Sequence, residues 1–91
     1  MQIRINGDSM WPTLRDGEVH PAEPAVDLAV GDIIVYAHPF QSGLKCVKRI
    51  TAIESESIHV EGDNPDPTAS DDSHNHGPIQ RDSVIARLIT G

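Results

Sequence analysis

The chain has 91 residues and a formal net charge of −7 at pH 7, with 14 acidic and 7 basic side chains. This length fits one small domain with a thin core, spanning residues 1–91. Nucleic acids and anionic membrane surfaces need clustered Lys and Arg, so we expect neither as a partner. The single cysteine, Cys46, cannot form an internal disulfide, and no apolar run reaches the length of a membrane span. We therefore expect a soluble protein of the cytoplasm.

Short strands separated by turns are predicted in the first half of the chain. Residues 2–5 alternate polar and apolar side chains, which indicates a short strand. Residues 18–30 contain prolines and are predicted to be irregular, with one brief extended piece. The apolar, β-branched residues 33–37 predict a strand, and the loop over 38–43 leads to a second strand over 44–53.

The second half of the chain continues this pattern. A tight connection is predicted over 54–56, a third strand over 57–61 and a long loop over 62–77. Residues 83–89 are expected to close the chain as a strand or a short helix. Short strands with turn signals between them predict an all-β fold, either a folded sheet or a partly open barrel.

Acidic side chains are concentrated between residues 54 and 72, where no Lys or Arg occurs. They are Glu54, Glu56, Glu61, Asp63, Asp66, Asp71 and Asp72. Such a stretch usually forms a solvated face. It would also attract a basic substrate.

Two segments carry residue types that suit hydrolysis. Gly-Asp-Ser-Met places Ser9 in a tight polar turn, and Val-Lys-Arg-Ile places Lys48 in an apolar run. A serine hydroxyl becomes a strong nucleophile only when a base takes its proton. A lysine can be that base when burial disfavours the ammonium form and lowers its pKa. Together the segments predict a Ser-Lys protease, whereas either one alone also fits a turn serine or a solvated lysine.

Strand alternation selects Lys48 rather than Lys45 as the base. On a strand, Lys48 shares its face with Cys46 and Ile50, and this face carries no other charge. We therefore expect this face to be the dry one. Arg49 lies on the opposite face and is expected to stay in water.

A serine-hydrolase mechanism follows from this pair. Lys48 would accept the Ser9 proton, pass it to the leaving amine and then activate the water that releases the acyl-enzyme. The backbone N–H of Ser9 is the expected oxyanion donor, and Gly7 would allow a close approach of the backbone. No metal and no cofactor are expected.

The order of the motifs resembles that of bacterial signal peptidase I. The matching segments are Gly-Asp-Ser-Met-x-Pro-Thr-Leu at 7–14, Gly-Asp-Ile-Ile-Val at 31–35, Val-Lys-Arg-Ile at 47–50, Gly-Asp-Asn-Pro at 62–65, Ser-Asp-Asp-Ser at 70–73 and Gly-Pro-Ile at 77–79. Within that family the chain is most similar to compact forms that mature nickel-type superoxide dismutase. The resemblance implies a LexA-like catalytic fold, Ser9 as nucleophile, Lys48 as base, and removal of an N-terminal leader from the dismutase precursor.

The resemblance also implies supporting residues. Ser70 matches a serine that orients the base lysine, and Asp72 matches an acid that pairs with an arginine two positions later. Here that position is His74, and His76 stands where an aromatic residue usually follows, so the ion pair is replaced or becomes pH-dependent. Gly7 occupies the place of the family's side-chain oxyanion donor, which leaves backbone donors only.

Signal peptidases bind their substrate as an added strand and favour small residues just before the cut. This similarity leads us to expect Met10 and the strand residues Ile34, Val35 and Tyr36 as the walls of the substrate groove.

Several other functions compete with this interpretation. The chain could be a general processing enzyme, or a degenerate protease that binds peptides at a sheet edge without cutting them. His74 and His76, with acidic neighbours, could handle nickel, although two histidines on a loop are more often solvated. Self-cleaving repressors of the SOS type share the serine and lysine motifs but carry their cleavage site well upstream, and eight residues precede Ser9 here. Cys46 as a nucleophile lacks a placed histidine, so a buried, inert thiol is expected.

Overall fold

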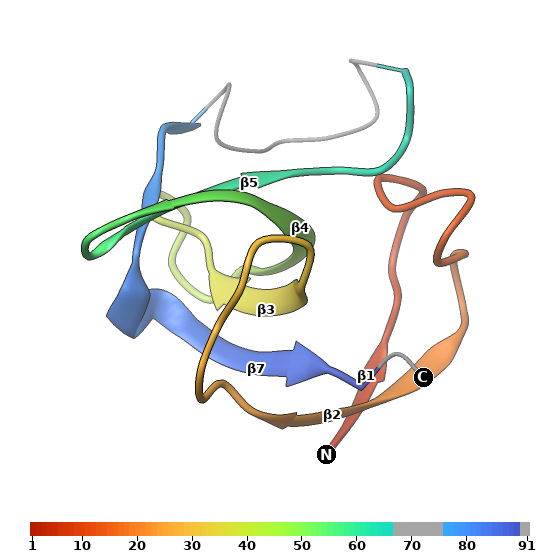
Figure 1. Cartoon of the computed structure of the whole chain (residues 1–91). Helices are drawn as coiled ribbons and strands as arrows, with labels where there is room; N and C mark the ends of the chain where they lie inside the picture. The colour runs from red at the N-terminus through yellow and green to blue at the C-terminus, as the bar shows by residue number, and fades with distance from the viewer. Residues whose placement is uncertain (67–75, 90–91) are drawn as a thin grey trace.

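The computed structural model describes residues 1–66 and 76–89. Within these ranges the elements are β1 (Gln2–Arg4), β2 (Val19–Pro24), β3 (Ile33–Ala37), β4 (Lys45–Glu54), β5 (Ser57–Glu61), β6 (Ile79–Gln80), the 3-10 turn η1 (Arg81–Ser83) and β7 (Val84–Leu88). The strands form one open antiparallel sheet in the order β1-β2-β7-β3-β4-β5-β6 (Figure 1). The predicted all-β fold class is confirmed.

Most of the predicted strands occur close to their expected bounds. β3 and β5 match the predictions exactly, and β4 is displaced by one residue at each end. The C-terminal segment is a strand preceded by η1, rather than a helix. Two features were not predicted: the two-residue strand β6, and the full six-residue length of β2.

β3 is the centre of the sheet because its side chains are apolar on both faces. Ile33 and Val35 belong to one buried cluster, and Ile34 and Tyr36 belong to another. These four side chains are 0–3% exposed. A strand buried on both faces can occupy only an interior position, and β3 pairs with β4 on one side and β7 on the other.

The buried apolar side chains of the described residues form two clusters. The first contains Ile5, Met10, Leu14, Ala22, Ile33, Val35, Ala86 and Leu88. The second contains Ile34, Tyr36, Ile50, Ile58, Val60 and Ile79. The first cluster thus includes three residues from the segment that follows β1, Ile5, Met10 and Leu14, and their burial packs this irregular segment against the sheet.

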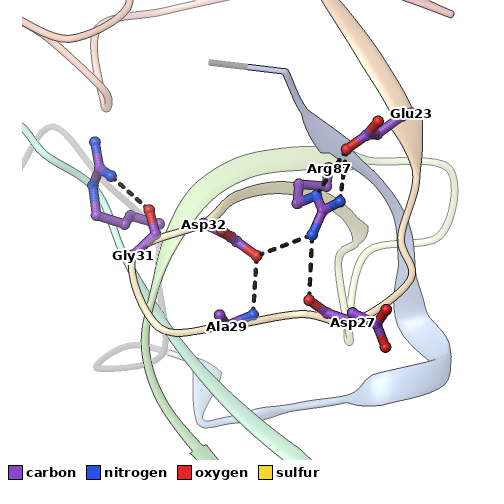
Figure 2. A network of polar contacts seen from close by, with 7 residues as sticks. Glu23, Asp27, Ala29, Gly31, Asp32 and Arg87 are labelled. Carbon is purple, nitrogen blue, oxygen red and sulfur yellow. Dashed lines mark hydrogen bonds and ion pairs between the residues drawn. The ribbon is translucent and has the colours of Figure 1, made fainter. Parts of the chain in front are cut away.

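A polar network holds the long connection before β3 against β7. Arg87 donates to the Glu23 carboxylate at 2.6 and 3.2 Å and to the Asp27 carbonyl at 3.2 Å (Figure 2). Arg87 also lies 3.5 Å from the Asp32 carboxylate, which accepts the backbone N–H of Ala29 at 2.9 Å. One arginine therefore links β7, β2 and the segment that enters β3.

No helix within the described ranges is long and apolar enough to cross a membrane.

Candidate active site

The turn that carries Ser9 is anchored by buried residues on both sides. Ile5 precedes it at 3% exposed and Met10 follows it at 1% exposed. Gly7 adopts φ +89°, a conformation that favours glycine, and its N–H donates to the Asp16 carboxylate at 2.7 Å. A Cβ at Gly7 would meet no atom within 4 Å, so the backbone angle, not lack of space within the chain, explains the glycine.

Lys48 reaches this turn from the middle of the sheet. It lies on β4 opposite Ile34 of β3, and its side chain is buried at 6% exposed. Its Nζ donates to Ser9 Oγ at 2.8 Å, across 39 positions of sequence. Cys46 and Ile50 contribute to the second cluster, in agreement with the alternation that predicted a dry face.

The segment after β5 holds the Ser9 turn in place. The side-chain Nδ2 of Asn64 donates to the Asp8 carbonyl at 2.8 Å, and its backbone N–H donates to the Ser9 carbonyl at 3.0 Å. Asn64 Oδ1 in turn accepts the backbone N–H of Asp66 at 2.9 Å. Figure 1 shows the turn after β1 beside the end of β5. The position of Ser9 therefore depends on Asn64.

A second set of hydrogen bonds joins Arg49, the neighbour of Lys48, and Thr13 to the carboxylate of Asp63. Arg49 donates to Asp63 through Nε at 2.9 Å and Nη2 at 2.7 Å, and to the Gly31 carbonyl through Nη1 at 2.7 Å. Thr13 Oγ1 donates to the same carboxylate at 2.6 Å. The Arg49 guanidinium holds the pKa of Asp63 below its ordinary value, because its hydrogen bonds favour the ionised carboxyl. Arg49 was expected in water; it is only partly exposed and is ion-paired.

An open cleft of about 260 Å³ lies beside Ser9. It is lined by Arg4, Ile5, Asn6, Gly7, Asp8, Ser9, Met10, Lys45, Cys46, Val47 and Lys48. One side of the cleft thus comes from β1 and the turn after it, and the other side comes from the first half of β4.

This lining differs from the expected groove. Met10 does line the cleft, but Ile34, Val35 and Tyr36 do not. The reason is the interior position of β3: both of its edges are paired, and its side chains fill the two cores. A strand in that position has no free edge for an added strand, and the cleft beside Ser9 is formed by β1, the turn after it and β4 instead.

The remaining candidates divide into described and undescribed residues. Ser70, Asp72 and His74 lie outside the described residues. Cys46, expected to be buried, is only partly buried and lines the cleft, whose described lining contains no histidine. His76 is 8% exposed: its Nε2 lies 3.0 Å from Tyr36 Oη and its Nδ1 lies 2.7 Å from the Gly77 carbonyl.

These contacts make His76 a residue of the core. Both of its ring nitrogens have hydrogen-bond partners, and its ring contacts that of His38 edge-on, with centroids 5.1 Å apart. The described residues contain no group of three or more His, Cys, Asp or Glu side chains that could hold a metal ion.

Three side chains hold the segment around Ser9 by hydrogen bonds and were not predicted from residue patterns, namely Thr13, Asp63 and Asn64. The Gly-Asp-Asn-Pro segment that contains two of them was noted only in the resemblance to signal peptidases. A carboxylate between a glycine and an asparagine, ahead of a proline, gives no hint of a partner far away in sequence.

The arrangement has the parts that acyl transfer requires. A hydroxyl and a buried amine are within hydrogen-bond distance, and both line an open cleft. The backbone N–H of Ser9 has no hydrogen-bond acceptor among residues 1–66 and 76–89. That N–H can therefore donate to a ligand in the cleft.

Comparison with known proteins assigns the chain to a peptidase family. A family model described as "Signal peptidase, peptidase S26" matches residues 1–66, the part of the chain that contains the Ser9 turn, β4 and the Asn64 segment. A search among curated proteins finds no match.

Proposed function

The chain belongs to the signal peptidase family, which makes it a peptidase with a protein substrate, and on that premise we propose that it uses a Ser-Lys pair. Ser9 is the nucleophile and Lys48 is the general base. The observation that carries the proposal is the 2.8 Å contact between Lys48 Nζ and Ser9 Oγ, with the lysine almost fully buried. Burial disfavours the ammonium form, and only the neutral amine can take the hydroxyl proton.

The proposed reaction has two stages. Ser9 Oγ attacks the carbonyl carbon of the scissile bond while Lys48 takes the hydroxyl proton and then transfers it to the leaving amine. Water, deprotonated by Lys48, hydrolyses the acyl-enzyme and regenerates the hydroxyl. The Ser9 backbone N–H stabilises the oxyanion in both stages, and Gly7 supplies no side-chain donor.

The edge of β1 supports binding of the substrate as an extended strand. The Ile5 N–H donates to the Glu18 carbonyl and the Ile5 carbonyl accepts from the Gly17 N–H, both at 2.8 Å, so both polar groups of Ile5 face β2. In an antiparallel ladder this direction alternates, so the backbone groups of Arg4 face away from β2, along the edge that lines the cleft. A peptide paired with this edge would lead its scissile bond toward Ser9.

We further propose that the substrate is a precursor with an N-terminal leader, most specifically the precursor of nickel-type superoxide dismutase, and that processing occurs in the cytoplasm. This part of the proposal is supported by the resemblance of the ordered motifs to the compact maturation proteases. A different leader ending in small residues is the natural alternative within the same family.

The test is cleavage of a nickel superoxide dismutase precursor peptide with its leader intact, read by mass spectrometry. We expect a single cut by the wild type, and none by Ser9→Ala or Lys48→Met. Methionine has nearly the length of lysine and fills the same buried space, so the second variant removes the base with little change in packing. Ser42→Ala, in the exposed loop after β3, is the matched serine control.

Each result separates one part of the proposal from the rest. Cutting of other leaders but not this one would keep the Ser-Lys chemistry and reject the substrate. Cutting that persists in Ser9→Ala would reject the chemistry. Tight binding of extended peptides without any cutting would favour the peptide-binding module, which the same β1 edge and cleft would also serve.

A further inference from the structure

The distribution of positive charge around the cleft differs from that of the whole chain. Most basic side chains of the described residues are already engaged. Arg49, Arg81 and Arg87 form ion pairs with carboxylates, and Lys48 donates to Ser9. Arg4 and Lys45 are both exposed and form no ion pair within residues 1–66 and 76–89, and both line the cleft. Arg15 is a third exposed cation without an ion pair in the described part of the chain, but it lies outside the cleft, so Arg4 and Lys45 are the two that a ligand in the cleft would meet.

Arg4 and Lys45 belong to opposite sides of this groove. Arg4 is the last residue of β1 and Lys45 is the first residue of β4. Asp8 is the one carboxylate among the described lining residues, so it offsets only one of the two charges. Lys48 does not add to them when it acts as a base, because it is then neutral.

The net charge of −7 would by itself repel an acidic substrate. That repulsion acts at long range and is screened over a Debye length of about 8 Å at physiological salt. A carboxylate inside the groove meets the two cations at contact distance, where an Arg can bind it through two parallel hydrogen bonds. The local charges therefore decide selectivity, although the acidic segment after residue 54 had suggested attraction of basic substrates.

We propose that Arg4 and Lys45 select substrates that carry an acidic side chain close to the scissile bond. The proposal rests on the peptidase function above and specifies its substrate class as acidic leader peptides. It also assigns a role to two side chains that take no part in the proton transfers.

The experiment uses matched peptides that end in a common cleavage site with alanine before the cut. Each carries a single Asp, or Asn in its place, at one of the positions around that site. We expect the wild type to show kcat/KM about 3- to 10-fold higher for Asp than for Asn at one position or more, the size expected for two partly solvated ion pairs. The ratio should fall toward unity in 0.5 M salt.

The variants Arg4→Gln and Lys45→Gln should each reduce the Asp-to-Asn ratio, and the double variant should abolish it. Arg15→Gln removes an exposed arginine outside the groove and should keep the wild-type ratio. Because a ratio is measured within each variant, a general loss of activity does not imitate the effect. A ratio of one or less at every position, or a ratio unchanged in the double variant, would overturn the proposal.

Failure of the peptidase function itself is distinguishable. If wild type and Ser9→Ala both leave every peptide uncut, fluorescence anisotropy of the labelled peptides on Ser9→Ala measures the same preference as a ratio of Kd values. Tighter binding of the Asp peptides, lost in the double variant, would retain the acidic-ligand proposal without the chemistry. Equal binding would reject it.

Discussion

Removing the charge of Asp63 should weaken both the fold and the site, because this carboxylate joins β4 to the segment after β1. It accepts two hydrogen bonds from Arg49, at 2.7 and 2.9 Å, and one from Thr13, at 2.6 Å. The carboxylate side chain is 17% exposed and its arginine partner is 33% exposed. Charge-assisted bonds contribute about 1.5–3 kcal/mol net, and partial exposure places this pair in the lower half of that range.

We therefore expect Asp63→Asn to lower the free energy of unfolding by about 2 kcal/mol at pH 7, measured by urea denaturation. For a domain of this size that corresponds to a Tm lower by roughly 8–16 °C. Glu56→Gln is the matched control, because its carboxylate lies 3.8 Å from Arg81 and is 75% exposed. It should change stability by no more than the experimental error.

The difference in unfolding free energy between wild type and Asp63→Asn should also depend on pH. The pKa of Asp63 is lower in the folded chain than its ordinary value of 3.8, chiefly because of the hydrogen bonds from Arg49. Its contribution to stability is therefore complete above the unfolded value and is lost as pH falls through the folded value. The gap between wild type and Asp63→Asn should be constant above about pH 5 and close below pH 4. A gap no larger than that of Glu56→Gln, or one that widens in acid, would refute the reasoning.

Two further substitutions test the contacts around the site. Asn64→Ala removes the side-chain amide that donates to the Asp8 carbonyl, just before Ser9. Because small misplacements of a reacting group have large effects on rate, kcat/KM should fall roughly 10- to 100-fold. An unchanged kcat/KM would show that the Ser9 turn does not need this hydrogen bond. Tyr36→Phe removes the 3.0 Å contact to His76 and should lower the free energy of unfolding by about 1–2 kcal/mol in urea denaturation. A neutral effect there would mean that His76 finds another partner.

Local sequence patterns predicted the strands in which the order of polar and apolar residues matches the burial of their side chains. The continuous apolar run of β3 and the alternation around Lys48 were both recovered in the structure. β2 was underestimated because its prolines suggested irregularity. Within β2, the Ala22 N–H donates to the Met1 carbonyl and the Ala22 carbonyl accepts from the Met1 amine. Because this direction alternates along a strand, the Pro21 nitrogen, which has no hydrogen to donate, faces away from β1. The Pro21 carbonyl accepts a hydrogen bond from the Ile89 N–H.

Local sequence patterns did not predict the order of the strands in the sheet. Three of the expected groove residues lie on β3, whereas the cleft beside Ser9 is lined by β1, β4 and the turn after β1; the four consecutive apolar residues at 33–36 are typical of a strand covered on both faces. The cleft between β1 and β4 depends on contacts between residues far apart in sequence, including the hydrogen bonds from Asn64 to the Ser9 turn. The pattern of residues within one strand cannot predict such contacts.

The most direct test of the Ser-Lys pair is the rate at which Ser9 is acylated, which needs no knowledge of the natural substrate. A small reactive ester is added to wild type and to Lys48→Met, and the modified residue is located by peptide mass spectrometry. We predict a single acyl group on Ser9, formed at a rate that rises with pH through one ionisation, and about 10²–10⁴-fold slower formation in Lys48→Met. Equal rates in the two proteins, or an acyl group on Cys46 instead, would contradict the assignment of Lys48 as the base and Ser9 as the nucleophile.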